Sequence, residues 1–192
     1  MKRMKSNQSI RRYFFCFGWL FLLAIGSGCP TISPRPEWID HPAGDPLSKQ
    51  HVVVVGSSSF LPGVPESEIR KDAEVDGRKK LAAFLGIRIQ SIARDYSQIV
   101  GDLKDSQSIV SLVESQELRQ IVIQQTVRLS FVREFYPDRE EKTLYCLMTL
   151  EEKNFRRTFM QTLEKNLPKS HEPLSKDRQK AMKKLKDLVS KK

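Results

Sequence analysis

The chain has 192 residues, which is enough for one domain with extensions but too few for two domains of ordinary size. Its net charge of +10 is concentrated at the two ends, because residues 1–28 contribute +5 and residues 168–192 contribute +6. The body between them, 29–167, carries only −1, which argues against a nucleic-acid-binding domain, since such a domain needs a basic face on its folded part.

Residues 1–28 have the pattern of a secretory signal peptide. A basic segment precedes an apolar run from Tyr13 to Ile25, and small residues follow the run. The run has about thirteen residues, whereas a membrane-spanning helix needs about twenty, so a transmembrane anchor is the weaker alternative. Arg11-Arg12 also resembles a twin-arginine export signal, although Ile10 stands where that motif prefers Ser or Thr.

The signal ends in a triplet, Ser27-Gly28-Cys29, that resembles the end of a lipobox, where lipoprotein signal peptidase cuts before a lipidated cysteine. The two residues before the cysteine supply the small side chains that the cut requires, but Gly26 replaces the usual Leu. We therefore expect cleavage between Gly28 and Cys29, and attachment of fatty acyl chains such as palmitate to Cys29. Cleavage by ordinary signal peptidase is the alternative.

Residues 29–50 are predicted to be a proline-rich linker that holds the domain off the membrane. Five of the ten prolines lie in 30–50, and proline fixes φ and removes a backbone donor. The segment is therefore predicted to be neither helix nor central strand. Trp38 is the one tryptophan after the signal, and we expect it to cover an edge of the core; partner binding is the alternative.

A buried strand is predicted at 51–56, where four valines precede a glycine. A helix follows from about Glu66, and the small residues Ala73 and Gly77 allow it to lie close against a sheet. We expect this helix to continue through Gly86 until residues 101–106 end it, whereas a strand within 87–100 is the alternative. The continuing apolar stripe consists of Leu85, Ile89, Ile92, Tyr96 and Ile99.

An antiparallel hairpin is predicted in the second half of the body. Apolar residues alternate with others in 127–132 and again in 144–150, and a polar turn at 137–141 lies between them. A second helix follows, with apolar positions at Phe155, Phe159, Leu163 and Leu167. Residues 51–167 are thus predicted to form an α+β envelope domain, a small sandwich of a mostly antiparallel sheet packed against a long helix, with a C-terminal helix and a basic tail.

The tail, 168–192, is predicted to be a basic amphipathic helix, with a solvated, fraying segment as the alternative. We expect its short apolar stripe to add little to the packed core. Its lysines Lys183, Lys184 and Lys186 are candidate contacts for anionic lipid headgroups or an envelope polymer. The stripe consists of Ala181, Met182, Leu185, Leu188 and Val189.

The sequence carries no spacing typical of a catalytic or metal site. The three histidines are scattered, no G-x-S-x-G elbow is present, and no P-loop lysine follows Gly56. Cys146 alternates with apolar residues, so we expect a small buried side chain and no internal disulfide. We expect no catalytic residue, no metal and no cofactor.

Four segments together resemble the LPP-twenty lipoprotein family, the group of the twenty-kilodalton outer-membrane lipoprotein, whose domain is related to the N-terminal part of flagellar assembly protein T. The family usually has alanine at the position of Gly77. The resemblance implies a compact α/β domain on a lipid anchor, a structural role in the envelope or flagellum, and no catalytic residues. The segments are Pro36-Glu37-Trp38-Ile39, Val52–Gly56, Ala73-x3-Gly77-Arg78-x2-Leu81 and Tyr145–Thr149.

Two functions are therefore expected. The first is a non-catalytic envelope lipoprotein, held to a membrane lipid bilayer by its acyl anchor, that contacts an envelope protein partner. Pro30 follows Cys29 where inner-membrane retention often uses Asp, which favours the outer membrane facing the periplasm. The second function is binding of anionic headgroups or envelope polymer through the basic tail. An enzyme ranks third.

Overall fold

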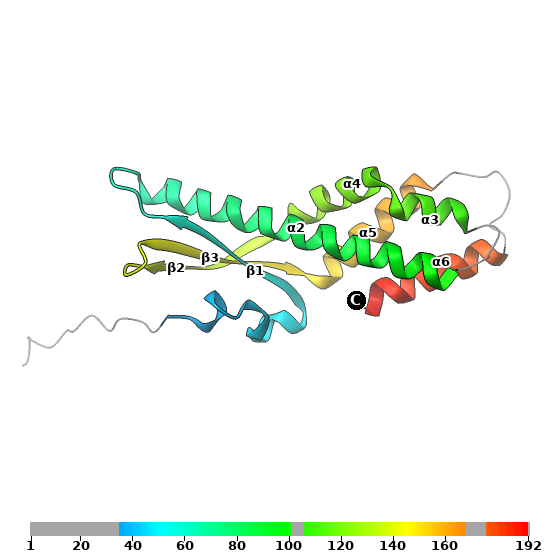
Figure 1. Ribbon diagram of the computed structural model, residues 1–192, viewed down its shortest axis with the longest axis horizontal. Coiled ribbons are helices and arrows are strands. Elements are labelled where there is room, and N and C mark those ends of the chain that lie inside the picture. The colour runs from blue at the N-terminus through cyan, green and yellow to red at the C-terminus, as the bar shows by residue number, and fades with distance from the viewer. Residues whose placement is uncertain (1–34, 101–105, 168–175, 192) are drawn as a thin grey trace, which may run out of the picture. The chain divides into compact units, whose positions relative to one another are not determined.

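The computed structural model describes residues 35–100, 106–167 and 176–191 (Figure 1). They form an α+β fold in which a three-stranded antiparallel sheet packs against one long helix, with further helices that include a C-terminal one. In chain order the elements are η1 (Glu37–Ile39), η2 (Pro42–Gly44), η3 (Pro46–Lys49), β1 (His51–Ser59), α2 (Glu66–Val100), α3 (Gln107–Glu114), α4 (Gln116–Val127), β2 (Phe131–Asp138), β3 (Thr143–Glu151), α5 (Glu152–Asn166) and α6 (Lys176–Lys191).

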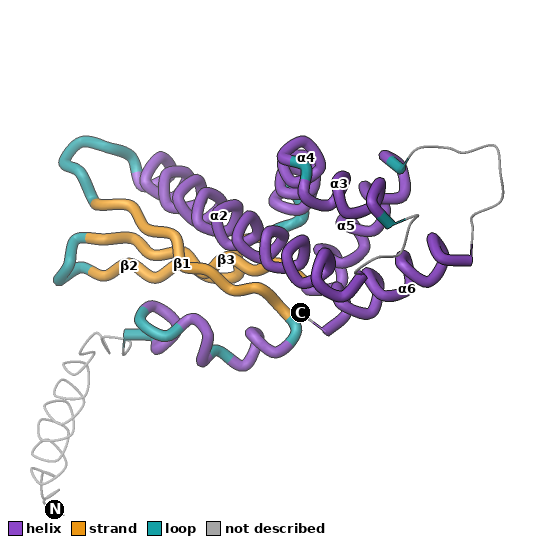
Figure 2. Tube along the Cα trace, turned by 45° about the vertical axis from the view of Figure 1, so that its right-hand side comes forward, coloured by secondary structure: helices purple, strands orange, loops and turns teal. Residues whose placement is uncertain are grey.

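The sheet has the strand order β1-β3-β2, so β3 is its central strand. β1 pairs with β3 over its whole length, from His51 opposite Glu151 to Ser59 opposite Thr143. β2 and β3 form the predicted hairpin, with an irregularity of register between Val132 and Glu134. Figure 2 shows α2 crossing one face of this sheet, while the three short 3₁₀-helices lie along the other.

Helix α2 approaches β1 so closely that their backbones touch, which confirms the role predicted for the small residues Ala73 and Gly77. A Cβ atom on Gly56 would lie 2.2 Å from the carbonyl oxygen of Ala73 and 2.5 Å from the amide nitrogen of Gly77. Two further contacts fix the helix along the edge of β1: the amide of Ser57 donates to Asp76 at 2.9 Å, and Lys80 donates to a carbonyl oxygen of β1 at 3.0 Å.

The predicted continuation of the helix through Gly86 is confirmed, because α2 is a single helix of 35 residues. Leu85, Ile89, Ile92 and Tyr96 are fully buried as expected. Ile99, by contrast, is 47% exposed, and Val100 is buried instead. The reason is the helical period of 3.6 residues, which moves the buried face on by about one position over this length.

The strand predicted from residue 127 is wrong in its first part. Residues 116–127 form α4, and β2 begins at Phe131, while Leu129 lies in the connection and is 40% exposed. Ser115 caps α4 by accepting from an amide of its first turn, and buried positions then recur every four residues. Helices α3 and α4 were not predicted, and the end of β2 at Asp138 falls where a turn was expected.

The part of the predicted linker that the structure describes, 35–50, is folded. Proline at the start of η2 and of η3 needs no amide donor there, which is why a proline-rich stretch forms 3₁₀-helices instead of a plain spacer. Trp38 in η1 is 7% exposed, so its predicted packing role is confirmed. The residues from Cys29 to Pro34 lie outside the described residues.

The expectation that the tail adds little to the core is also wrong. Helix α6 lies against the C-terminal half of α2 (Figure 1), and Lys184 donates to the carbonyl oxygen of Ile99 at 3.1 Å. Ala181, Leu185 and Val189 are each no more than 1% exposed and belong to the main hydrophobic cluster. Their spacing of four residues places all three on one face of the helix.

Candidate functional site

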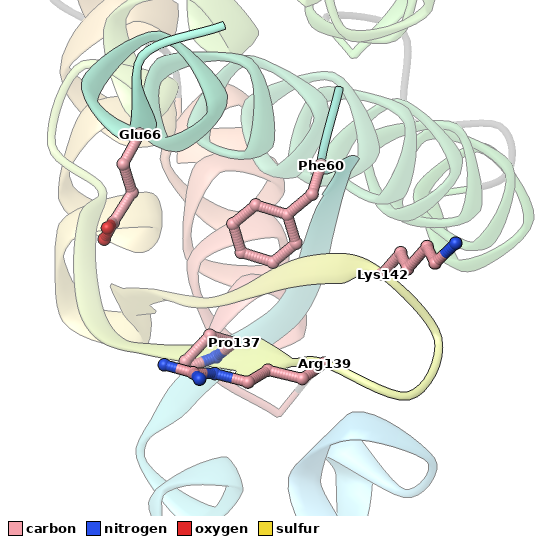
Figure 3. Close-up of a pocket in the computed structure, with 5 residues that line it drawn as sticks. All are labelled: Phe60, Glu66, Pro137, Arg139 and Lys142. Atoms are coloured by element: carbon pink, nitrogen blue, oxygen red, sulfur yellow. The ribbon is translucent and has the colours of Figure 1, made fainter. Parts of the chain in front are cut away.

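A pocket of about 380 Å³ lies at one end of the sheet, where the loop after β1 and the turn between β2 and β3 come together (Figure 3). We call this end of the domain the hairpin tip, defined as residues 60–66 and 137–142. In Figure 3 the Phe60 ring lies between α2 and the turn, and Glu66 reaches down from the start of α2. The pocket is lined by Phe60, Glu66, Pro137, Arg139 and Lys142.

The hairpin tip is held in shape by hydrogen bonds from its backbone amides. The amide of Phe60 donates to the carbonyl oxygen of Lys142 at 2.8 Å and so joins the loop to the turn. Asp138 accepts from the amides of Glu140 at 3.1 Å and Glu141 at 3.0 Å, which closes the turn. Gly63 has φ of +80°, a left-handed conformation that favours glycine.

Arg35 connects the start of the described chain to this turn. Its guanidinium donates to Asp138 at 2.8 Å and to Glu141 at 2.5 Å, and it lies 5.5 Å from the centre of the Tyr145 ring. Hydrogen bonds from Tyr145 and then Arg35 lower the pKa of Glu141. The first described residue is therefore fixed to the hairpin tip.

The charges at the hairpin tip are mixed. Glu66 pairs with Arg70 at 2.7 Å, and the Arg70 guanidinium lies 4.9 Å from the centre of the Phe135 ring. Among the described residues, the side chains of Arg139 and Lys142 have no ion pair, and neither has the neighbouring Glu140. The hairpin tip therefore presents exposed groups of both signs beside an apolar pocket wall.

The residues proposed from the sequence are not brought together. Gly28 and Cys29 lie outside the described residues, and Trp38 is buried under the sheet, where it is inaccessible to a partner. Lys183, Lys184 and Lys186 are exposed on α6, at the other end of α2 from the hairpin tip. Lys184 is also engaged by the carbonyl oxygen of Ile99.

A buried ion pair was missed by sequence reasoning. Arg88 is 8% exposed and donates to both carboxylate oxygens of Glu152, at 2.5 and 2.8 Å. Its guanidinium also lies 4.6 Å from the centre of the Phe155 ring. The one signal in the sequence is a charged residue inside the apolar stripe of α2. Because this guanidinium is engaged by both its partner and the ring, the pair joins α2 to α5.

Cys146 is fully buried, as predicted, and its thiol donates to the carbonyl oxygen of Ala73 at 3.1 Å. Burial raises the pKa of Cys146 to about 11. The side chain is therefore a neutral thiol at physiological pH, whereas a nucleophilic cysteine needs a depressed pKa and access to solvent.

Within the described ranges, no group of three or more His, Cys, Asp or Glu is placed to hold a metal ion. None of the helices in the described part of the chain is long and apolar enough to cross a membrane. Compared with known proteins, the chain matches no family model and no curated protein. The resemblance to the LPP-twenty family stays a prediction.

Proposed function

We propose that the chain is the precursor of a cell-envelope lipoprotein, anchored through acyl chains on Cys29, whose domain has a non-catalytic structural or interaction role. The observation that carries the proposal is the position of Cys29. It follows an apolar run and three small residues, and it stands only six positions before Arg35, the first residue of the folded unit. An outer-membrane location facing the periplasm, and an association with the envelope or flagellum, belong to the same proposal.

Two features of the domain support this role. Residues 35–192 form a compact unit, and the described residues of this unit supply two hydrophobic clusters of its own. Cys146 is buried inside the smaller cluster, so it is inaccessible for pairing with Cys29. A cysteine that is not needed for a disulfide is free to carry the lipid.

The proposal is tested by Cys29→Ser in the natural host membrane. We expect the variant to leave the membrane fraction and to lack acyl mass at its N-terminus, because a dual or triple acyl anchor holds far more firmly than surface contacts. Cys16→Ser within the signal is the matched control, and it should remain in the membrane. Retention of Cys29→Ser in membranes washed at high salt would show that the lipoprotein proposal is wrong.

A second candidate function is binding of an anionic polymer or headgroup by α6. Seven basic and two acidic residues lie in this helix, and Lys183 and Lys186 are exposed. Its apolar face is turned into the core, so only charge is left for binding, and such binding should weaken steeply with salt. Lys183→Glu with Lys186→Glu should abolish salt-sensitive binding to anionic vesicles. Lys79→Glu with Arg133→Glu, at two exposed positions outside α6 and the hairpin tip, is the matched double-charge control.

A further inference from the structure

The chain length between the proposed anchor and the folded unit limits how far the domain can stand from the membrane. Five residues, 30–34, separate Cys29 from Arg35, so the Cα atoms of these two residues lie at most about 20 Å apart. Arg35 is itself bound to Asp138 and Glu141 in the β2–β3 turn. An acylated Cys29 therefore keeps the hairpin tip within reach of the lipid headgroups.

The hairpin tip also has the surface that such a position requires. Leu61, in the loop after β1, is 60% exposed and places an apolar side chain on the surface of the hairpin tip. Beside it, the pocket combines the Phe60 ring and Pro137 with two cationic residues, Arg139 and Lys142, and the acidic Glu66 (Figure 3). Charges of both signs next to an apolar wall match a zwitterionic headgroup better than a purely anionic surface.

We infer that the hairpin tip docks on the bilayer that holds the acyl chains of Cys29, with Leu61 inserted among the lipids and the pocket on a zwitterionic phospholipid headgroup. Arg139 takes the lipid phosphate and Glu66 faces the lipid ammonium. This inference rests on the proposed lipidation of Cys29. A single inserted leucine binds weakly by itself, but the short tether gives it a millimolar effective concentration at the surface.

The same geometry places α6 at the opposite end of α2 from the hairpin tip. Glu66 and Ile99 lie 33 residues apart on α2, which is about 50 Å along the helix axis, and Ile99 is the residue that Lys184 contacts. With the hairpin tip on the headgroups, the lysines of α6 stand away from the anchoring membrane. Docking by the tip and docking by α6 therefore predict opposite depths for residues along α2.

The test uses the chain from residue 29 onward, coupled through the Cys29 thiol to a maleimide lipid in phosphatidylethanolamine–phosphatidylcholine vesicles. Coupling is selective because Cys146 is fully buried. Leu61→Trp places an indole at the hairpin tip, and Ile87→Trp places one at a 70% exposed site in the middle of α2. Quenching of each indole by brominated phospholipid reports its depth, while circular dichroism checks that each variant is folded.

Brominated phospholipid should reduce the fluorescence of the introduced indole at least twofold in Leu61→Trp. In Ile87→Trp it should reduce that fluorescence by less than a tenth. Arg139→Glu, added to Leu61→Trp, should reduce the quenching at least twofold, whereas Lys183→Glu should leave it unchanged. No quenching of Leu61→Trp, equal quenching at both sites, or sensitivity to Lys183→Glu but not Arg139→Glu would each overturn the inference.

The maleimide supplies the anchor chemically, so this result does not depend on lipidation in the cell. The mass of the mature N-terminus decides the proposed function, and quenching decides the docking geometry. If Cys29 carries no acyl chains in the cell and Leu61→Trp is still quenched, the lipoprotein proposal fails, and the quenching shows only that the hairpin tip docks when Cys29 is anchored chemically.

Discussion

The two hydrophobic clusters of the domain are closed in different ways. The smaller one, beside the hairpin tip, consists of Ile69, Ala73, Leu144 and Cys146, and it lies where Gly56 allows two backbones to touch. The larger cluster is filled by bulky side chains from the second half of α2, the neighbouring helices and the sheet. The smaller cluster should therefore be sensitive to added atoms, and the larger one to removed atoms.

The largest expected effect comes from removing α6, which takes atoms from the larger cluster. Deleting residues 176–192 strips Ala181, Leu185 and Val189 from the core, at a cost on the order of 5 kcal/mol in the free energy of unfolding. The melting temperature should then fall by about 10–20 °C, measured by circular dichroism.

If the deletion variant does not fold, a pair of point variants tests the packing of α6 instead. Leu185→Ala should cost about 2–5 kcal/mol, because the side chain is fully buried. Lys183→Ala, two positions earlier on the exposed face, should change stability by less than about 0.5 kcal/mol. Equal melting temperatures for these two variants would mean that α6 does not pack as described.

The next largest effect is expected when an atom is added beside the smaller cluster. Gly56→Ala places a Cβ 2.2 Å from a backbone oxygen and 2.5 Å from a backbone nitrogen, neither of which can move without shifting α2. We expect a loss of about 3 kcal/mol in urea unfolding.

Gly77→Ala is the matched control, since its nearest contact is 3.3 Å, to the mobile end of Met148. Alanine also favours a helix over glycine by about 1 kcal/mol, so this variant should be close to neutral. A Gly77→Ala loss as large as that of Gly56→Ala would refute the distinction between rigid and flexible neighbours.

The smaller region was the more predictable one from sequence. Ala73 and Gly77 predicted a close contact between helix and sheet, because small residues at helical spacing leave room for a neighbouring backbone. The valine run and the hairpin were equally local signals. The identity of the strand residue that touches the helix, Gly56, could not be predicted, because it depends on how two distant segments align.

The larger cluster was predicted less well, because the burial of each of its helices depends on helices that are distant in the sequence. The stripe of α6 resembles that of any surface helix, and only the packed partner shows that Leu185 is core. The apolar residues of 116–127 fit a strand or a helix equally until the cap at Ser115 is recognised. The hairpin tip pocket was not foreseen at all, because Phe60 and Glu66 come from one segment and Arg139 from another that is distant in the sequence.

The smallest effect, the response of Cys146 to pH, measures how well the smaller cluster excludes water. Burial raises the pKa of Cys146 from 9.0 to about 11, so above pH 9 the unfolded chain loses this proton while the folded chain keeps it. The folded state then binds more protons than the unfolded state, and stability must fall as pH rises through this window. Burial raises the pKa of Tyr96 from an ordinary 10.0 to about 12, and the hydrogen bond to Glu141 raises the pKa of Tyr145. Both tyrosines add a fall of the same sign that grows towards and above pH 10, so the thiol contributes most of the fall between pH 9 and 10. We expect the midpoint of urea unfolding to decline across that interval in the parent and to decline less in Cys146→Ala, which itself costs about 1–2 kcal/mol at pH 7. Parallel slopes for the two proteins would mean that the thiol titrates alike in the folded and unfolded chains, and hence that water reaches the cluster behind Gly56.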